Sequence, residues 1–205
     1  MENFILGLFT SGSLILAIGP QNLFVIEQGL KRNFVFTITT ICAASDILLI
    51  FIGIFIYHIF DSISLEVEVI LNIILIVFLI NYIKDKIGSL KKEYKIENIE
   101  RSQNFKEIIL KTLGFTYLNP HVYSDTVFIL GNLSKNFALQ EKFYFAFGAS
   151  FASIIFFYSL GYMSSMFASF IKKKNTWKYI NSFIISFMSI LVIYITYDTY
   201  VRVFS

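Results

Sequence analysis

Asn119-Pro120-His121-Val122-Tyr123-Ser124-Asp125 decides how this chain folds, because it places a proline and a carboxylate inside an apolar segment. The stretch free of Lys, Arg and Glu runs from Thr112 to Ser134, which is 23 residues. That length crosses the roughly 30 Å hydrocarbon core of a membrane. An acid at mid-membrane costs about 2.5–3.5 kcal/mol, so it usually faces a protein interior or a water-filled cavity on a substrate or ion path. Proline disfavours helix at the preceding residue, so we expect a helix break just ahead of Asp125.

The composition is that of a polytopic membrane protein. Of the 205 residues, 56% are hydrophobic and 18% aromatic, against about 45–50% apolar residues in ordinary soluble domains. The single cysteine, Cys42, excludes an intramolecular disulfide and a cysteine-based metal cluster. We therefore expect no cofactor and no resident metal. Met1-Glu2-Asn3 lacks the basic start of a cleavable signal peptide, so the first apolar stretch is expected to be retained.

Six apolar stretches predict transmembrane helices. They cover residues 4–26, 33–60, 69–83, 110–133, 143–171 and 179–201. The third has only 15 residues before Lys84, so it must recruit the residues before it or thin the bilayer. Residues 84–107 mix both charge signs and are expected to form a solvated cytoplasmic connector between two halves, 1–83 and 108–205.

The two halves show signs of an internal repeat. Ala44-Ser45 is followed by Gly53 at the same spacing as Ala152-Ser153 by Gly161, and the two prolines of the chain each stand beside an asparagine in the first or fourth stretch. A unit of three spans makes the second copy enter from the opposite side, which gives an inverted repeat. The expected fold is therefore an all-α polytopic membrane protein with six transmembrane helices as two inverted three-helix repeats in one transporter domain. Helices 1 and 4 are expected to be broken at their Asn/Pro motifs.

Small residues in the second and fifth stretches are candidates for close helix packing. Gly148 and Ala152 form a small-xxx-small pair of the kind that lets membrane helices approach closely. We assign Ser45, Gly148, Ala152 and Ser153 to helix packing.

The distribution of Lys and Arg predicts the orientation in the membrane. With six spans, fourteen of these residues fall on the side of the 84–107 connector and three on the other. The positive-inside rule then places the connector in the cytoplasm and both termini outside. The positive charge is thus explained by topology, and we expect no nucleic-acid partner.

Asp46 and Asp125 are the only carboxylates near the middle of any stretch, one in each half. No Lys or Arg lies at mid-span, so their positive partner would be a substrate, a metal ion or a proton. The alternative is that both are structural acids, hydrogen-bonded to hydroxyls. The candidates for that role are Ser45, Ser124 and Thr126.

The breaks Gly19-Pro20-Gln21-Asn22 and Leu118-Asn119-Pro120-His121 are expected to expose backbone groups at membrane depth. The N-terminus of a half-helix suits a carboxylate, and freed carbonyl groups suit a cation. Asn22 and Asn119 would satisfy the freed backbone or orient a ligand, and His121 would relay protons or serve as a structural histidine. A simple structural kink is the alternative at each break.

Several motifs together resemble the lysine/arginine exporter family. They are Ala17-Ile18-Gly19-Pro20-Gln21-Asn22, Gln28-Gly29-Leu30, Ala44-Ser45-Asp46, the stretch Leu118–Thr126, and Leu130-Gly131. The resemblance covers both halves, and Ser124 departs from it because the family is expected to carry a bulkier apolar residue there.

The resemblance implies an exporter of basic amino acids, L-lysine or L-arginine, in the bacterial inner membrane, with the family aspartates at Asp46 and Asp125. Alternating access coupled to inward H⁺ or Na⁺ would drive export. The substrate-binding residues expected are Gly19, Pro20, Gln21, Asn22, Asp46, Asn119, Pro120, His121 and Asp125. The expected partners are the substrate, the coupling ion and the lipid bilayer, with a homodimer left open.

Three other classes of function remain open at this point: an exporter of a different substrate, a hydrolase and a scaffold. The wider superfamily includes exporters of other amino acids and of divalent metal cations, for which carboxylate oxygens are suitable ligands. An intramembrane aspartyl hydrolase would need both acids close enough to share a proton. A membrane scaffold without transport is the third.

Overall fold

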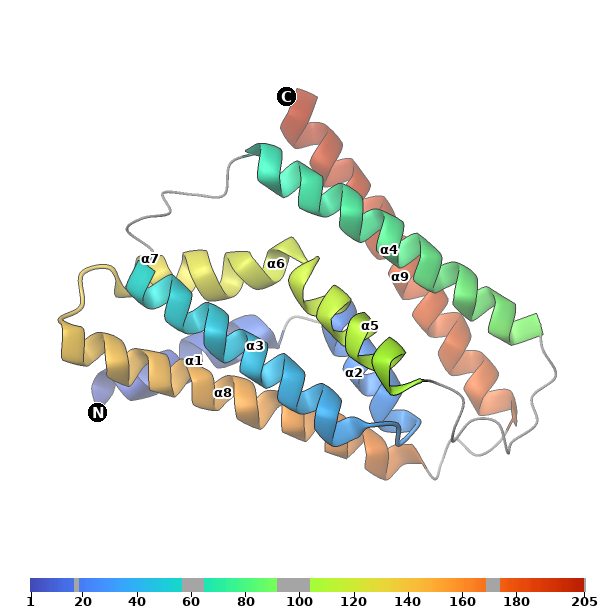
Figure 1. Cartoon of the computed structure of the whole chain (residues 1–205), viewed down its shortest axis with the longest axis horizontal. Coiled ribbons are helices and arrows are strands. Elements are labelled where there is room, and N and C mark those ends of the chain that lie inside the picture. Colours follow the sequence, from blue (N-terminus) through green and yellow to red (C-terminus); the bar gives the residue numbers. More distant parts are fainter. Residues whose placement is uncertain (17–18, 57–64, 92–103, 169–173, 205) are drawn as a thin grey trace.

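The computed structural model describes residues 1–16, 19–56, 65–91, 104–168 and 174–204, and every regular element in these ranges is helical (Figure 1). The elements are α1 (Glu2–Ile15), α2 (Pro20–Leu30), α3 (Val35–Ile56), α4 (Leu65–Lys91), α5 (Phe105–Tyr117), α6 (Pro120–Tyr123), η3 (Ser124–Ile129), α7 (Leu130–Ser134), α8 (Leu139–Met166) and α9 (Lys174–Phe204). The all-α class expected from the sequence therefore holds for the described part of the chain.

Both prolines begin a helix. α2 starts at Pro20, and the axes of α1 and α2 differ by 82°. α6 starts at Pro120 after α5 has ended at Tyr117. The first helical position suits proline because its missing N–H would have no intrahelical partner there. The expected breaks in the first and fourth apolar stretches are thus present, and a helix N-terminus follows each of them.

The second break leads into an irregular helix. After the four residues of α6, the chain forms the six-residue π-helix η3 and then the short α7. Asp125 is the second residue of η3. The expected helix break at Asn119-Pro120 did not include this widened turn. Such π-helical turns are rare and often occur at functional sites.

Only some of the described helices match a membrane span by length and composition. α3, α8 and the part of α9 from Tyr179 to Val201 do so, and the bent pair α1–α2 would make a fourth span. The apolar part of α4, Asn72–Lys84, is too short, and the fourth stretch is divided between α5 and the segments after Pro120. Six crossings therefore remain a prediction.

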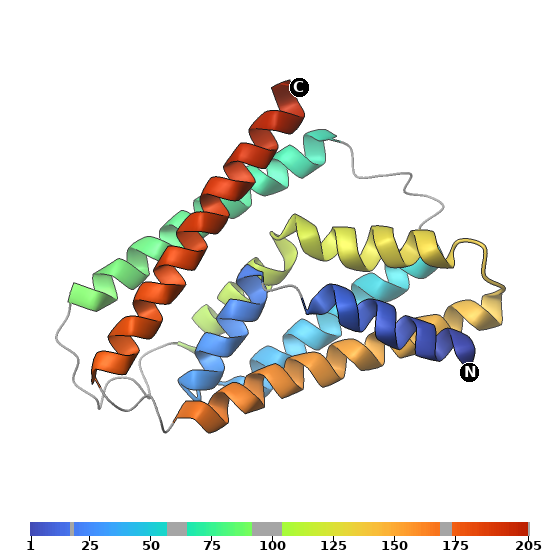
Figure 2. The same ribbon diagram turned by 180° about the vertical axis from the view of Figure 1, so that it is seen from behind.

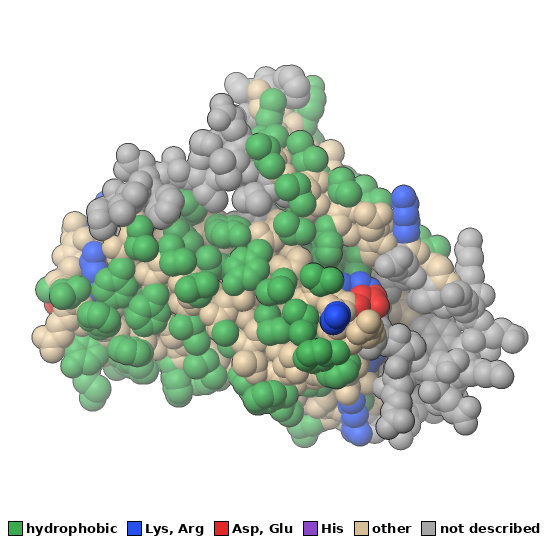
Figure 3. Space-filling model, viewed as in Figure 1, with side chains coloured by type: hydrophobic (Ala, Val, Ile, Leu, Met, Phe, Trp, Pro, Cys, Tyr) green, Lys and Arg blue, Asp and Glu red, His purple; other side chains and the backbone are tan. Residues whose placement is uncertain are grey.

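The surface fits a lipid environment. Hydrophobic side chains cover the middle of the face in Figure 3, with Lys and Arg toward its two ends. Phe9, Phe36 and Ile193 are each more than half exposed. In water such a surface would drive aggregation, whereas in a bilayer it would contact the lipid chains.

α4 differs from the helix that the sequence predicted. The expected span ended at residue 83, but the helix continues to Lys91 and so takes up the first part of the expected 84–107 connector. This extension contains three lysines, a leucine and no proline, so its charges end the apolar stretch without ending the helix. α5 begins at Phe105, and residues 92–103 lie outside the described residues.

The helices pack as a central group with a pair at its side. α3 and α8 lie side by side, α1 and α2 both pack on α8, and α4 pairs with α9 (Figures 1 and 2). A buried apolar cluster that includes Phe24, Leu79, Phe115 and Met188 joins the α4–α9 pair to α2 and α5. The two helix breaks lie next to this joint.

Candidate functional site

A cavity of about 390 Å³ lies where the two helix breaks meet. It brings together eight of the nine residues predicted to bind substrate: Gly19, Pro20, Gln21, Asn22, Asp46, Asn119, His121 and Asp125. The ninth is Pro120, whose backbone begins α6 and whose side chain lies outside the description. The cavity size falls within the range of about 300–1,000 Å³ that is usual for small-molecule sites.

Asp46 projects into the cavity from the middle of α3. Its side chain is 3% exposed, and its Oδ2 accepts a hydrogen bond of 3.0 Å from Ser153 Oγ on α8. This bond joins α8 to α3 across 107 residues. The hydroxyl that contacts Asp46 is thus that of Ser153, which was assigned to helix packing, and not one of the three hydroxyls named as candidates from the sequence. A serine bond orients the carboxylate without neutralising its charge.

Asp125 reaches the same cavity from η3, in the half of the chain opposite to Asp46. It is partly exposed, and His121 lies four residues before it on the same wall. Thr126, expected as a hydroxyl partner of the acids, instead donates to the Val122 carbonyl. The two acids thus approach one cavity from separate elements.

The two helix breaks face each other across the cavity. A Cβ atom on Gly19 would lie 3.9 Å from Asn119 Nδ2, so the breaks are nearly in contact. Asn22 Nδ2 donates to the Ile15 carbonyl that α1 leaves open, at 3.1 Å. Asn119 Oδ1 accepts from the His121 backbone N–H at 3.2 Å. Both asparagines therefore repair the backbone that the breaks expose, which was one of the two expected roles.

The remaining walls are mostly apolar. α8 contributes Phe157, and α9 contributes Leu191, Tyr194 and Ile195. Among the described residues that line the cavity there is no Lys or Arg. Nor do any three His, Cys, Asp or Glu side chains in the described ranges stand together as metal ligands would. The cavity therefore offers negative charge, backbone N–H groups and an apolar wall.

The four residues assigned to helix packing lie on α3 and α8, and Ser45 is buried on α3. A Cβ atom on Gly148 would collide with the Phe4 carbonyl on α1, and one on Gly12 of α1 would touch Ala152. Gly148 and Ala152 thus lie against α1, which forms one wall of the cavity, whereas Ser153 faces Asp46.

Sequence reasoning missed one buried charge near the site. Glu27 was interpreted as the residue that ends the first apolar stretch, yet α2 continues to Leu30 and Glu27 is 1% exposed. The signal available in the sequence was its position seven residues after Pro20, two helical turns along the helix that the break begins.

Comparison with known proteins identifies relatives along almost the whole chain. The family described as LysE type translocator matches residues 12–199. The chain is 33% identical to the arginine exporter protein ArgO of Klebsiella pneumoniae subsp. pneumoniae, over 85% of this chain and 84% of that protein. It is 32% identical to the arginine exporter protein ArgO of Photorhabdus laumondii subsp. laumondii, over 90% of each. No solved structure matches the chain.

Proposed function

The chain belongs to the LysE type translocator family, and we propose that it exports L-arginine and L-lysine from the bacterial cytoplasm. Membership makes it a multi-pass transporter of the bacterial inner membrane and an amino-acid exporter. The choice of basic substrates is supported by one observation above all. Two carboxylates from different halves line one cavity whose described lining holds no Lys or Arg, so the compensating positive charge would be the substrate's own.

The substrate would lie across the cavity with its charges separated. Its cationic side chain would meet Asp46 and Asp125, while its α-carboxylate would meet the N-terminus of α2. There the backbone N–H groups of Gln21 and Asn22 precede the first intrahelical bond, which Leu23 donates to Gly19. The apolar wall around Phe157 would contact the aliphatic part of the side chain.

Two inverted repeats that rock against each other would alternate access to this cavity. The packing supports the proposal, because helices in equivalent positions pair: α3 with α8, and α4 with α9. Each half also makes a close contact with the other through an equivalent glycine. Gly53 of α3 approaches Val127 beyond the second break, and Gly161 of α8 approaches Gly29 beyond the first.

Export of a monocation must work against the membrane potential. Moving one positive charge outward against an inside-negative potential costs about 2.3 kcal/mol per 100 mV. Inward movement of H⁺ or Na⁺ would offset this cost. An aspartate that binds a proton in the empty carrier and the substrate in the loaded one would couple the two movements.

The test is efflux from cells that lack other basic amino-acid exporters. Cells loaded with Arg- or Lys-containing dipeptides should release arginine or lysine faster when they produce this protein. Asp46→Asn and Asp125→Asn should each reduce that release to background at normal membrane abundance. Unchanged release from both variants would contradict the assignment of the acids.

The same cells separate the alternatives. Release of neutral amino acids without arginine or lysine would indicate another exporter of the superfamily. A divalent-metal exporter would show metal efflux, although the described residues contain no three-ligand group suited to holding such an ion. A hydrolase would release a product chemically different from what was loaded.

A further inference from the structure

Glu27 is a buried carboxylate on the basic side of the cavity. It lies on α2, about 9 Å along the helix from the cavity-lining residue Gln21, given a rise of about 1.5 Å per residue. Its exposed fraction of 1% is lower than the 3% of Asp46. The same end of the molecule holds Lys31, Arg32 and Lys111, which the positive-inside rule assigns to the cytoplasm.

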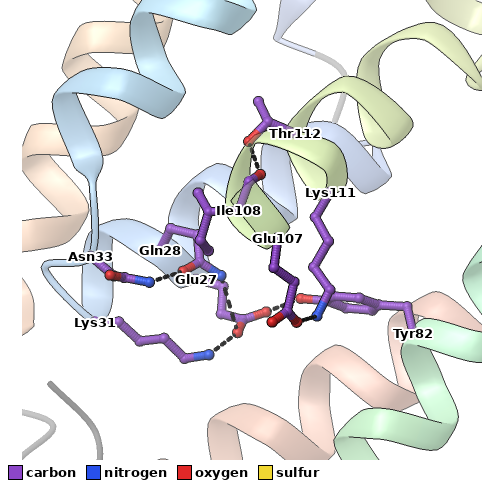
Figure 4. A network of polar contacts seen from close by, with 9 residues as sticks. All are labelled: Glu27, Gln28, Lys31, Asn33, Tyr82, Glu107, Ile108, Lys111 and Thr112. Atoms are coloured by element: carbon purple, nitrogen blue, oxygen red, sulfur yellow. Dashed lines mark hydrogen bonds and ion pairs between the residues drawn. The ribbon is translucent and has the colours of Figure 1, made fainter. Parts of the chain in front are cut away.

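Glu27 is paired with a lysine side chain and joined to a neighbouring helix (Figure 4). One carboxylate oxygen accepts from Lys31 Nζ, and the other accepts from the hydroxyl of Tyr82 on α4. The Gln28 amide adds a long bond of 3.5 Å. The side chain of Lys31 is 15% exposed, so the Glu27 oxygen that it contacts lies close to the protein surface.

An aromatic layer separates Glu27 from the cavity. Phe24 stacks on Phe115 with ring centroids 4.7 Å apart, and Phe115 meets Tyr82 edge-on at 5.0 Å. Phe24 and Phe115 are almost fully buried. The cavity lies directly behind this layer, because Thr116, the residue after Phe115, accepts a hydrogen bond from the cavity-lining residue Gln21. Tyr82 thus contacts both the layer and Glu27.

We propose that Glu27 is a second binding site for the cationic side chain of the substrate, on the cytoplasmic side of this layer, and that the Lys31 ammonium occupies it in the resting protein. The proposal rests on the function proposed above. A buried carboxylate is costly when unpaired, so exchanging one cation for another avoids the unpaired state. Lysine and arginine side chains offer the same charged N–H donors as Lys31.

A purely structural role for Glu27, tying α2 to α4 through Tyr82, predicts a different result at Lys31. If Glu27 only joins helices, removing Lys31 weakens the protein or does nothing to substrate affinity. If Lys31 competes with the substrate, removing it strengthens substrate binding from the cytoplasmic side. The two roles therefore differ in the sign of the effect.

The experiment measures labelled-arginine uptake into inverted membrane vesicles preloaded with unlabelled arginine, which exposes the cytoplasmic side and does not depend on the coupling ion. Glu27→Gln should raise the half-saturating arginine concentration about tenfold or more, as for a lost bond to a charged group. Lys31→Met should lower it about threefold. Two variants outside the Glu27 contacts are the controls: Glu141→Gln, on an exposed carboxylate at the start of α8, and Lys106→Met, on an exposed lysine at the start of α5. Both should stay within about twofold of the parent.

The outcomes separate this proposal from the function on which it rests. No arginine exchange by the parent protein would overturn both. Exchange by the parent that Asp46→Asn abolishes, together with Glu27→Gln and Lys31→Met values matching the controls, would overturn the Glu27 site alone. If Glu27→Gln does not reach the membrane, Lys31→Met decides, because it keeps the carboxylate. An increase in its half-saturating concentration would reject the proposal.

Discussion

Ser153 determines how Asp46 presents its charge, because it provides the hydrogen bond that crosses from α8 to α3. The carboxylate is almost fully buried, so its orientation depends on few partners. A hydroxyl that holds one oxygen leaves the other oxygen for a cationic ligand. Ser153 is therefore expected to act through Asp46 as a positioning residue.

Removing this hydroxyl should weaken export without abolishing it. Ser153→Ala deletes one hydrogen bond to a charged group, worth about 1.5–3 kcal/mol, so export efficiency should fall about tenfold or more. Asp46→Asn should be more severe. Ser159→Ala, on an exposed position of the same helix, is the control. Arginine efflux per amount of membrane-inserted protein measures the difference, and equal effects of the two serine variants would reject the role.

At the residue scale, the sequence identified the cavity lining but not the contacts within it. Polar residues and prolines at membrane depth are costly, so Asp46, Asp125 and both breaks could be recognised from their positions. Ser153 is 107 residues from Asp46, and a single sequence holds no signal for that pairing. Glu27 was missed because a charge at the edge of an apolar stretch usually marks the membrane surface.

At the scale of elements, α1 depends on its contact with α8. A Cβ atom on Gly7 would collide with the Phe145 carbonyl, and one on Gly148 with the Phe4 carbonyl. The two backbones therefore touch through reciprocal glycines, as in closely packed membrane helices. Because the end of α1 lines the cavity, this contact also positions the first helix break.

One methyl group at this contact should destabilise the protein. Gly148→Ala must separate two backbones, and overpacking of this kind typically costs about 1–3 kcal/mol. Gly88→Ala on α4 is the matched control, because nothing lies within 4 Å of its added Cβ. Alanine is also the better helix former by about 1 kcal/mol. Thermal unfolding in detergent should show a lower midpoint for Gly148→Ala and an unchanged or higher one for Gly88→Ala. The reverse order would refute the packing account.

Element boundaries were predicted where the chain has strong local signals and missed where it lacks them. The prolines gave both break positions, since their ring excludes interior helix. The length of α4 was underestimated because charges at Lys84 and beyond end an apolar stretch but allow the helix to continue. The π-helix at Ser124–Ile129 was not predicted, because these six residues contain no proline or glycine that would mark a change of helix type.

At the scale of the whole molecule, charge distribution predicts which end faces the cytoplasm. The α7–α8 connection around Lys135 and the start of α5 at Lys106 are both exposed and belong to opposite predicted sides. Cys42 is fully buried, so replacing it leaves a background in which single cysteines report their own location.

Orientation can be read from thiol labelling in intact cells. In a Cys42→Ser background, Lys135→Cys should react with a membrane-impermeant maleimide added outside. Lys106→Cys should react only after the cells are permeabilised, and the background protein should not react in either case. Labelling of Lys106→Cys in intact cells would reverse the predicted topology.

The arrangement of the halves was only partly accessible from the sequence. A repeat of small residues and paired breaks suggested two equivalent units, and the contacts of Gly53 and Gly161 fit that relation. The pairing of α4 with α9 beside the other helices had no local signal, because apolar helices of similar composition can pair in many ways. Which helices pair is determined by packing between residues far apart in the sequence.

The wide turn that carries Asp125 makes the site sensitive to chain length. A π-helix accommodates an additional residue within an otherwise α-helical path. An in-frame deletion of the Ser124 codon, directly before Asp125, would let the segment relax into an ordinary α-helix. Each residue of an α-helix turns by about 100°, so the acid would swing away from the second acid by more than a quarter of a circle. Both acids would still be present in the chain, yet they would no longer face the same cavity.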